Sequence, residues 1–397
     1  MTRYGYKQTE IGVIPEDWDC VKIGSVASVL MCKRIFVDQT SDHGEIPFYK
    51  IGTFGKQADA FISRTLYNEY KNKFSFPKEG DVLLSAAGTL GRTVVYDGKD
   101  AYYQDSNIVW LDIDKRVLCN EYLNHYYRVI KWMSSEGSTI SRLYNGIICG
   151  TSIVIPPLAE QERIAEALSD VDELISSLEK LIEKYKSIKA TCLQQMFPQK
   201  GETTPKMRLP GFAGAWEQRK LGDVCQITMG QSPDGATYSD VPSDYILVQG
   251  NADLKNGWVF PRAWTTQKTK TAEAGDLIMS VRAPAGAMGK TNYNVVLGRG
   301  VAGIKGNEFI YQTLVKMDED GYWKRLAAGS TFESINSDVI SNAEIAVPQD
   351  VDEQEKLGAY FHNLDNLITL HQRKLDKAKK IKQGMMQQLL TGKIRLL

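Results

Sequence analysis

The longest regular pattern of apolar and polar positions in the chain lies between Leu158 and Phe197. Apolar residues recur there three and four positions apart, and Lys189 breaks the row. This spacing predicts a seam along one long helix, because no Pro or Gly interrupts it before Pro198. Such a helix is roughly 57 Å long at about 1.5 Å per residue. Its apolar stripe is too narrow to be buried alone, so a partner helix is required.

A second stretch, Asp352–Leu390, supplies that partner because it repeats the first pattern at a fixed offset. An offset of 193 residues carries the polar break at Lys189 onto Lys382. Leu178 is a mismatch, since its counterpart is His371. A repeat of this length predicts two copies of a large unit rather than an array of small ones.

We expect the two helices to pair with one another along their apolar seams. The predicted seam comprises Ile164, Leu168, Val171, Ile175, Leu178, Ile182 and Tyr185 on the first helix and Leu357, Phe361, Leu364, Ile368, Leu375 and Met385 on the second.

The segments before the helices also repeat. Trp18–Val26 and Trp216–Val224 share the pattern W-x-x-x-K-[IL]-G-x-V, which predicts a common strand and turn that open each globule. Each globule ends in an apolar strand and a proline that lead into an E-Q-E helix start. Further matched landmarks are Gly80–Ser85 with Gly275–Ser280, Gly91-Arg92-Thr93 with Gly289-Lys290-Thr291, and Gly137-Ser138-Thr139 with Gly329-Ser330-Thr331.

The pattern therefore predicts a globule, a helix, a second globule and a second helix. In the first globule we expect strands at 47–51, 82–85, 93–96 and 108–111, and helices at 66–74 and 121–133. The predicted boundaries are 1–157 for the first globule with its leader at 1–17, 158–197 for the central helix, 198–215 for a linker, 216–348 for the second globule and 349–397 for the C-terminal helix.

Composition narrows the class of protein. The 397 residues, 43% hydrophobic and 24% charged, are sufficient for two domains with real cores. The formal net charge is zero, so any basic surface must be local. Six scattered cysteines without a C-x-x-C pair favour neither zinc nor disulfides. The N-terminus lacks a signal-peptide core and no run approaches about 18 apolar residues, so we expect no membrane association and a cytoplasmic location.

Several motifs suggest chemistry but do not form a catalytic group. Gly298–Gly303 is a literal G-x-G-x-x-G, but its helix is expected to start only near Glu308, so we interpret it as a turn that presents Arg299 rather than a dinucleotide site. Pro233-Asp234 followed by Asp253-x-Lys255 loosely matches a nuclease pattern, which turn residues explain equally well. The four histidines lie far apart in the sequence, and we predict no catalytic residue and no metal site.

The end of the chain is basic. The charged residues concerned are Lys374, Lys377, Lys379, Lys380, Lys382, Lys393 and Arg395. Two interpretations remain open for this run: a solvated helix face, or contact with nucleic-acid phosphates or an acidic partner.

Two variable globules, each followed by a long helix that opens with E-Q-E, resemble the specificity (S) subunit of type I restriction–modification enzymes. The most specific stretches are Ile155–Glu162, Val347–Glu355 and Gln387–Lys393. The resemblance implies an α+β fold class, with two α+β target recognition domains, two long helices that form an antiparallel coiled coil, and a pseudo-twofold internal repeat. Antiparallel pairing would bring the Ile164 end of the first helix beside the Met385 end of the second.

The resemblance also implies a function. Such a subunit is non-catalytic, and each target recognition domain recognises one half of a bipartite, asymmetric site in double-stranded DNA. The helices set the spacer and dock two methyltransferase (M) subunits, and two restriction (R) subunits complete the complex. S-adenosylmethionine, ATP and Mg²⁺ are expected on those partners, and no cofactor on this chain. Lengthening or shortening the helices by one turn near 187–191 and 380–384 should then change the spacer.

Direct recognition of bases favours polar and basic side chains on loops. The candidates are Lys33, Arg34, Arg92, Gln104, Ser106 and Asn107 in the first domain and Gln231, Ser232, Arg282, Lys290 and Arg299 in the second. Two alternatives stay open: the specificity subunit of another restriction system, and an enzyme that uses the glycine motif or the Asp253/Lys255 pair.

Overall fold

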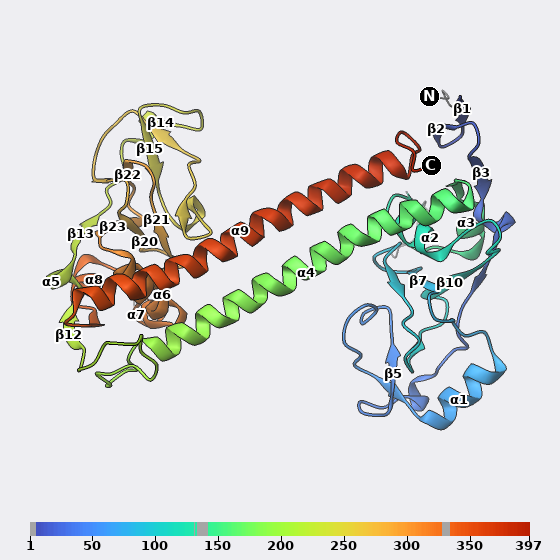
Figure 1. The fold of residues 1–397 in the computed structure, drawn as a ribbon, viewed down its shortest axis with the longest axis horizontal. Coiled ribbons are helices and arrows are strands. Elements are labelled where there is room, and N and C mark those ends of the chain that lie inside the picture. Colours follow the sequence, from blue (N-terminus) through green and yellow to red (C-terminus); the bar gives the residue numbers. More distant parts are fainter. Residues whose placement is uncertain (1–4, 131, 133–141, 328–333) are drawn as a thin grey trace. The chain divides into compact units, whose positions relative to one another are not determined.

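The computed structural model describes residues 5–130, 132, 142–327 and 334–397. The chain divides into two compact units: residues 1–177 with 375–397 (unit 1), and residues 178–374 (unit 2). Two helices of 39 residues, α4 (Leu158–Met196) and α9 (Val351–Leu389), each contribute to both units. Both are unbroken in Figure 1, as the seam pattern predicts.

Unit 1 is built around a four-stranded sheet whose two inner strands are buried on both faces. Val82 and Leu84 face one core with Trp18 and Tyr122, whereas Leu83 faces a second core. This explains why the inner strands are continuous apolar runs rather than alternating ones. The sheet has the order β4 (Ala27–Leu30), β10 (Ile108–Ile113), β7 (Val82–Ser85), β8 (Thr93–Val95).

The second core of unit 1 lies under a smaller sheet and one helix. These elements are β6 (Phe61–Ile62), β5 (Ile46–Tyr49), β9 (Tyr102–Tyr103) and α1 (Arg64–Lys73). Ser63 caps α1 through its side chain, which accepts a hydrogen bond from the Leu66 amide. The leader forms a hairpin of β1 (Tyr6–Thr9) and β2 (Gly12–Pro15), an element that the sequence pattern did not predict.

The repeated Trp motif forms a strand at the start of each globule, as predicted. In unit 1, β3 (Asp19–Lys22) pairs with β11 (Ser152–Ile155), the strand that leads into α4. In unit 2, β12 (Glu217–Lys220) pairs with β24 (Glu344–Val347), which leads into α9. Close packing requires the repeated glycine. A Cβ on Gly24 would lie 2.9 Å from the Cβ of Cys149, and a Cβ on Gly222 would lie 2.9 Å from the Cβ of Ser341.

Unit 2 contains two larger sheets. The first has the order β13 (Gln226–Met229), β23 (Val301–Lys305), β20 (Leu277–Ser280), β21 (Met288–Lys290), β17 (Trp258–Val259), β16 (Leu254–Lys255). The second has the order β14 (Tyr238–Ser239), β18 (Trp264–Thr265), β15 (Tyr245–Val248), β22 (Val295–Leu297), β19 (Thr271–Ala272). The remaining helices of the two units are α2 (Asn120–Tyr126), α3 (Asn145–Gly150), α5 (Leu221–Val224), α6 (Glu308–Glu319), α7 (Tyr322–Ala327) and α8 (Ser337–Ser341), with short 3₁₀ turns at Ile23–Ser25, Val37–Gln39, Gly235–Thr237 and Asn251–Asp253.

Within each unit the segments of α4 and α9 pack in antiparallel fashion, as predicted. In unit 1, Ile164 shares a core with Leu389, and Met385 packs against it. In unit 2, Lys189 meets Asp365, and Cys192 lies 3.3 Å from the Tyr360 hydroxyl. The seam residues Ile164, Leu168, Leu178, Ile182, Leu357, Phe361, Leu364 and Leu375 are buried, and Val171, Ile175, Tyr185, Ile368 and Met385 are half-buried.

The polar break in the seam is explained by the pairing. Lys189 Nζ lies 2.7 Å from Asp365 in unit 2, and its repeat Lys382 bonds Asp172 in unit 1. Each lysine therefore meets a carboxylate of the opposite helix. A mostly buried ion pair at a seam position favours one register and one orientation over others.

Some predicted bounds differ from the structure. The helix expected at 121–133 is too long, because α2 ends at Tyr126 and is followed by a turn. The aromatic and β-branched residues from Tyr126 to Ile130 are poor helix formers, which accounts for the early end. Met133 and the paired Gly-Ser-Thr landmarks lie outside the described residues.

Candidate functional site

In unit 1 the predicted DNA-contacting residues gather at one end of the four-stranded sheet. Lys33 and Arg34 follow β4, Arg92 precedes β8, and the run from Gln104 to Asn107 precedes β10. Because neighbouring strands here are antiparallel, the end of one strand and the start of the next meet at the same edge. Residues from separate parts of the sequence thus share one loop cluster.

The side chains of this cluster differ in availability. Arg34 is exposed and lies 4.0 Å from Asp105, and Lys33 lies over the Phe74 ring. Ser106, whose φ is +52°, bonds with Arg142, which also contacts Asn107. Arg142 follows the segment at 133–141 and was missed by the sequence analysis, because no pattern links it to the other residues.

Two unit-1 candidates are engaged in holding the loops. The guanidinium of Arg92 donates to the Ile51 carbonyl at 3.0 Å and lies over Phe54. The Gln104 side-chain oxygen accepts from the Ile51 amide at 2.9 Å. Both residues therefore shape the cluster, whereas Lys33 and Arg34 project from it.

Unit 2 repeats the arrangement at the matching end of its first sheet. Gln231 and Ser232 follow β13, Arg282 follows β20, and Arg299 precedes β23. The Arg299 amide donates to Ser232 Oγ at 3.2 Å, which joins two of these loops. Gln231, Arg282 and Arg299 are exposed. The unit therefore presents two arginines and one amide side chain at the sheet end.

The glycine-rich segment is a packing device of this cluster. A Cβ on Gly230 would lie 2.0 Å from the Gly298 carbonyl oxygen, and one on Gly300 would lie 2.0 Å from the Gln249 carbonyl oxygen. Strand β23 follows the glycines, and helix α6 begins only at Glu308. The segment therefore lacks the helix N-terminus that a dinucleotide site requires.

Lys290 is a correction to the predicted set, because it lies at the opposite end of β21 from the cluster. It is 7% exposed, and its Nζ lies 2.9 Å from Glu308 and over the rings of Trp258 and Tyr311. The sequence match of Lys290 with Arg92 was wrong by three residues. Backbone hydrogen bonds show that Gly91 corresponds to Gly286 instead. The Gly91 amide donates to the Ser85 carbonyl, and the Gly286 amide donates to the Ser280 carbonyl.

The acidic residues of the nuclease-like pattern have internal partners. Asp253 is buried and accepts from Arg262 at 2.9 Å, and Asp234 accepts from the Ala236 amide. The His371 ring packs at a tilt against the Tyr185 ring on the seam. Among the described residues no group of three or more His, Cys, Asp or Glu could hold a metal ion, and all six cysteines are free. No helix in the described part of the chain is long and apolar enough to cross a membrane.

In each unit a series of polar contacts joins the globule to the long helices. In unit 2, Gln312 on α6 bonds both Glu308 and Asp365, and Asp365 pairs with Lys189 of α4. In unit 1, Arg128 lies 3.1 Å from Asp172, which also bonds Lys382 of α9. Burial opposes ionisation of Asp172, but the hydrogen bond from Lys382 and the nearby cations outweigh it and lower its pKa.

In unit 1, His125 lies beside the polar contacts of Arg128, Asp172 and Lys382, and its imidazole is neutral at pH 7. Its Nε2 lies 3.1 Å from Ser169 Oγ, and its side chain is 2% exposed. Burial and the neighbouring Arg128 lower the pKa of His125 from 6.5 to about 4.

Acidification is therefore expected to destabilise unit 1 through His125. As the pH falls below about 6.5, His125 is protonated in the unfolded chain but stays neutral in the folded one. Stability therefore falls with pH until about pH 4, where the folded imidazole is protonated as well. His125→Gln should flatten this slope in urea unfolding followed from pH 7 to pH 4.5. Equal slopes for the two proteins would contradict the assignment.

The E-Q-E motif has a structural role in both units. Gln161 donates to the Pro156 carbonyl at 2.9 Å, and its repeat Gln354 donates to the Pro348 carbonyl at 3.1 Å, so each glutamine closes the strand-to-helix turn. The first glutamates, Glu160 and Glu353, are buried at 3% and 0% exposure. Each of them is bound by an arginine from the segment that follows the other helix.

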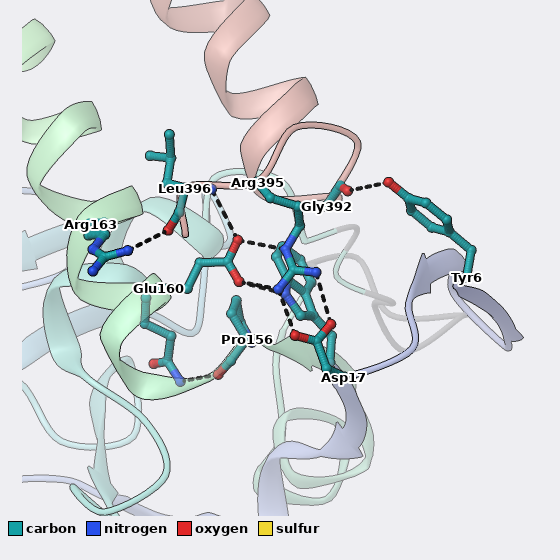
Figure 2. A network of polar contacts seen from close by, with 10 residues as sticks. Tyr6, Asp17, Pro156, Glu160, Arg163, Gly392, Arg395 and Leu396 are labelled. Atoms are coloured by element: carbon teal, nitrogen blue, oxygen red, sulfur yellow. Dashed lines mark hydrogen bonds and ion pairs between the residues drawn. The ribbon is translucent and has the colours of Figure 1, made fainter. Parts of the chain in front are cut away.

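In unit 1 this arginine is Arg395. Its guanidinium donates to both Glu160 oxygens at 2.7 Å and to both Asp17 oxygens at 2.9 and 2.7 Å (Figure 2). In unit 2, Arg208 donates to both Glu353 oxygens at 2.7 Å and to the Gly214 carbonyl. The unit-1 clasp is Asp17, Glu160 and Arg395, and the unit-2 clasp is Arg208, Gly214 and Glu353.

The clasps were missed because their arginines looked like surface charges. The signal was present, since Lys206-Met207-Arg208-Leu209 repeats as Lys393-Ile394-Arg395-Leu396. Arg395 and Lys382, two members of the basic run at the chain end, are therefore engaged in ion pairs within unit 1. The segment at 198–215, predicted as a linker, likewise contributes Arg208 to unit 2.

The chain matches the family model described as the type I restriction modification DNA specificity domain twice, over residues 15–189 and 214–380. Each match contains one globule and most of the long helix that follows it. The second match ends before Arg395. The sequence repeat and the family model thus divide the chain in the same way.

Individual proteins of this type are similar over different lengths. A Haemophilus influenzae protein named as a type I restriction enzyme specificity subunit is 50% identical over 176 residues, which is 44% of this chain and 46% of that protein. The MjaX specificity subunit of Methanocaldococcus jannaschii is 27% identical over 98% of this chain and 97% of its own. The crystal structure of an S subunit from M. genitalium is similar in fold, with a TM-score of 0.67 at 14% identity over 94% of this chain and 96% of its own.

Proposed function

This chain belongs to the type I restriction modification DNA specificity family, and from that premise we propose that it is the DNA sequence-recognition subunit of a type I restriction–modification complex. Each target recognition domain recognises one half of a bipartite, asymmetric site in double-stranded DNA. The observation that carries the proposal is the repeated cluster of exposed polar and basic side chains at the matching end of each unit's sheet. Because the clusters share a scaffold but differ in residues, they suit two unlike half-sites.

The repeated helices support a role as spacer and docking surface. Exposed apolar side chains occur along both, with Leu174 51% and Ile381 47% exposed. Beside Ile381 an apolar groove of about 380 Å³ is lined by Met385, Leu389 and Ile394. Exposed apolar surface of this kind is typical of contact with another protein, and the helices that carry it are themselves repeated within the chain. We assign this surface to two M subunits, with two R subunits completing the complex.

The chemistry is assigned to those partners. S-adenosylmethionine is expected on the M subunits and ATP and Mg²⁺ on the R subunits, while this chain positions them on DNA in the cytoplasm without catalytic activity of its own. The internal bonding of Asp234 and Asp253 supports this division of roles. Cleavage of DNA with magnesium, or methyl transfer, by the purified chain alone would contradict it.

Replacing Gln231, Arg282 and Arg299 together by Ala is expected to relax one or more positions in one half of the methylated site and leave the other half unchanged. A lost base contact relaxes one position, whereas a lost phosphate contact weakens binding at all sequences alike. Mapping of methylated bases in a host expressing the variant with its M subunit gives the readout. The matched control is Lys305→Ala, an exposed basic residue at the other end of β23. An unchanged motif in the triple variant would remove this cluster as a recognition surface.

A further inference from the structure

The two clasps occupy the junctions where target domains meet helices. In unit 1, Asp17 immediately precedes Trp18 and strand β3, Glu160 lies in the first turn of α4, and Arg395 follows α9. One guanidinium therefore ties the opening of the target domain, the start of one helix and the tail of the other (Figure 2). Figure 2 also shows Tyr6 of the leader hairpin bonded to the Gly392 carbonyl, which adds the leader to the same junction.

The unit-2 clasp makes the same three-way tie. Arg208 follows α4, Glu353 lies in the first turn of α9, and Gly214 lies just before Trp216 and strand β12. The backbone supports are repeated as well, since the Met207 amide donates to the Gln195 carbonyl at 2.9 Å and the Ile394 amide to the Gln388 carbonyl at 3.1 Å. One difference is that the Trp18 indole donates to Glu160, whereas the Trp216 indole nitrogen has no partner in the described part of the chain.

Resting on the proposed function, we propose that Arg395 and Arg208 are positioning residues for DNA recognition, each of which fixes one target domain on the helices and thereby controls recognition of one half-site only. The independence follows from location, because every residue of a clasp belongs to a single unit. Each arginine can hold its domain in one orientation because a bidentate hydrogen bond between a guanidinium and a buried carboxylate is strong and directional.

Removing an arginine has a local consequence. Glu160 and Glu353 are nearly inaccessible to water, so either carboxylate left without its guanidinium must move toward solvent or take up a proton. Either response loosens the first turn of the helix and the strand-to-helix turn beside it. The target domain then samples several orientations, and its loop cluster no longer meets its half-site in one register.

The experiment uses the full chain assembled with its M subunits and four DNA duplexes. These carry the site obtained from methylation mapping, the site with one half scrambled, the site with the other half scrambled, and the site with both scrambled. For each protein the ratio of Kd for a half-scrambled duplex to Kd for the intact site measures how well that half is recognised. In the wild type both ratios should be at least about tenfold.

Arg395→Met is expected to bring one of the two ratios to within about twofold of unity while the other keeps its wild-type value. Arg208→Met should show the reverse, so the pair of variants assigns each half-site to a unit. The preserved ratio shows that the rest of each variant is folded. Lys393→Met and Lys206→Met remove an exposed charge two residues away in each segment and should leave both ratios unchanged.

A second variant covers the case in which Arg395→Met does not fold. Asp17→Asn weakens the bonds between Arg395 and Asp17 but keeps the bond between Arg395 and Glu160. It should therefore lower the same ratio to a value between that of the wild type and that of Arg395→Met. Three outcomes would overturn the inference. In the first, one clasp variant brings both ratios to unity; in the second, the Arg395 and Arg208 variants bring the same ratio to unity; in the third, no variant changes either ratio. Failure of every clasp variant to fold would overturn it as well, since the clasps would then serve folding alone. A wild type that ignores both scrambled halves would contradict the proposed function instead.

Discussion

Lengthening both long helices by one turn at facing positions is expected to lengthen the spacer of the recognised site while leaving the two half-site sequences unchanged. The facing positions follow from the ion pairs, Lys189 with Asp365 and Asp172 with Lys382. Midway between them lie Lys180–Leu181 on α4 and Arg373–Lys374 on α9. Four added residues on each helix extend the pair by about 6 Å, which is close to two base pairs at about 3.4 Å each.

The positions of the insertions decide the outcome. Insertions near 187–191 and 380–384, which the sequence repeat suggested, lie at equivalent positions of the two helices but do not face one another. They would also add a turn to each helix, but the stretch between the two insertions would be shifted in register, which separates Lys189 from Asp365 or Asp172 from Lys382. Insertion into α4 alone is the control, and it should abolish methylation because the added turn has no partner. An unchanged spacer in the facing double insertion would contradict the role of the helices in setting the distance.

Asp365→Ala is expected to destabilise unit 2 by about 3 kcal/mol, because it leaves Lys189 mostly buried without its carboxylate. The Gln312 amide also loses one of its two acceptors. The change is measured as a lower midpoint of urea unfolding, followed by hydrogen exchange of α6 and α9 because a protein with two units need not unfold in one step.

Two controls separate the ion pair from general damage to the helix. Glu355→Ala removes an exposed carboxylate of the same helix and should change stability by less than about 0.5 kcal/mol. The double variant Lys189→Met with Asp365→Leu replaces the pair by apolar side chains and should recover most of the loss, since desolvation of both charges is avoided. A double variant less stable than Asp365→Ala would show that the pair itself is not the source of the effect.

The long helices and the order of domains were predictable because each rests on a periodic pattern repeated within the chain. Strand β7 was predicted at its observed bounds, since Val82–Ser85 is a short apolar run between turn residues. The seam predicted that the two helices pair, and the family resemblance implied that they pair antiparallel. The structure adds that the lysine at each polar break meets an aspartate of the opposite helix.

Other features depend on contacts that a single sequence does not display. Lys290 was misplaced because the match was made on Gly-Lys-Thr letters, whereas the hydrogen bonds of Gly286 set the true register. Arg92 and Gln104 were predicted as base contacts, but their bonds to Ile51 depend on a loop distant in sequence. Arg395 looked like the end of a solvated basic run, because its partners Asp17 and Glu160 lie hundreds of residues away along the chain.

The central claim, that one chain recognises two unlike half-sites at a set distance, is tested most directly by mapping methylated bases in a host that expresses this chain with its cognate M subunit. The account predicts one new methylated motif made of two short, different specified sequences separated by an unspecified spacer of constant length. A continuous motif, a palindromic motif, or the same motif obtained with the M subunit alone would contradict it.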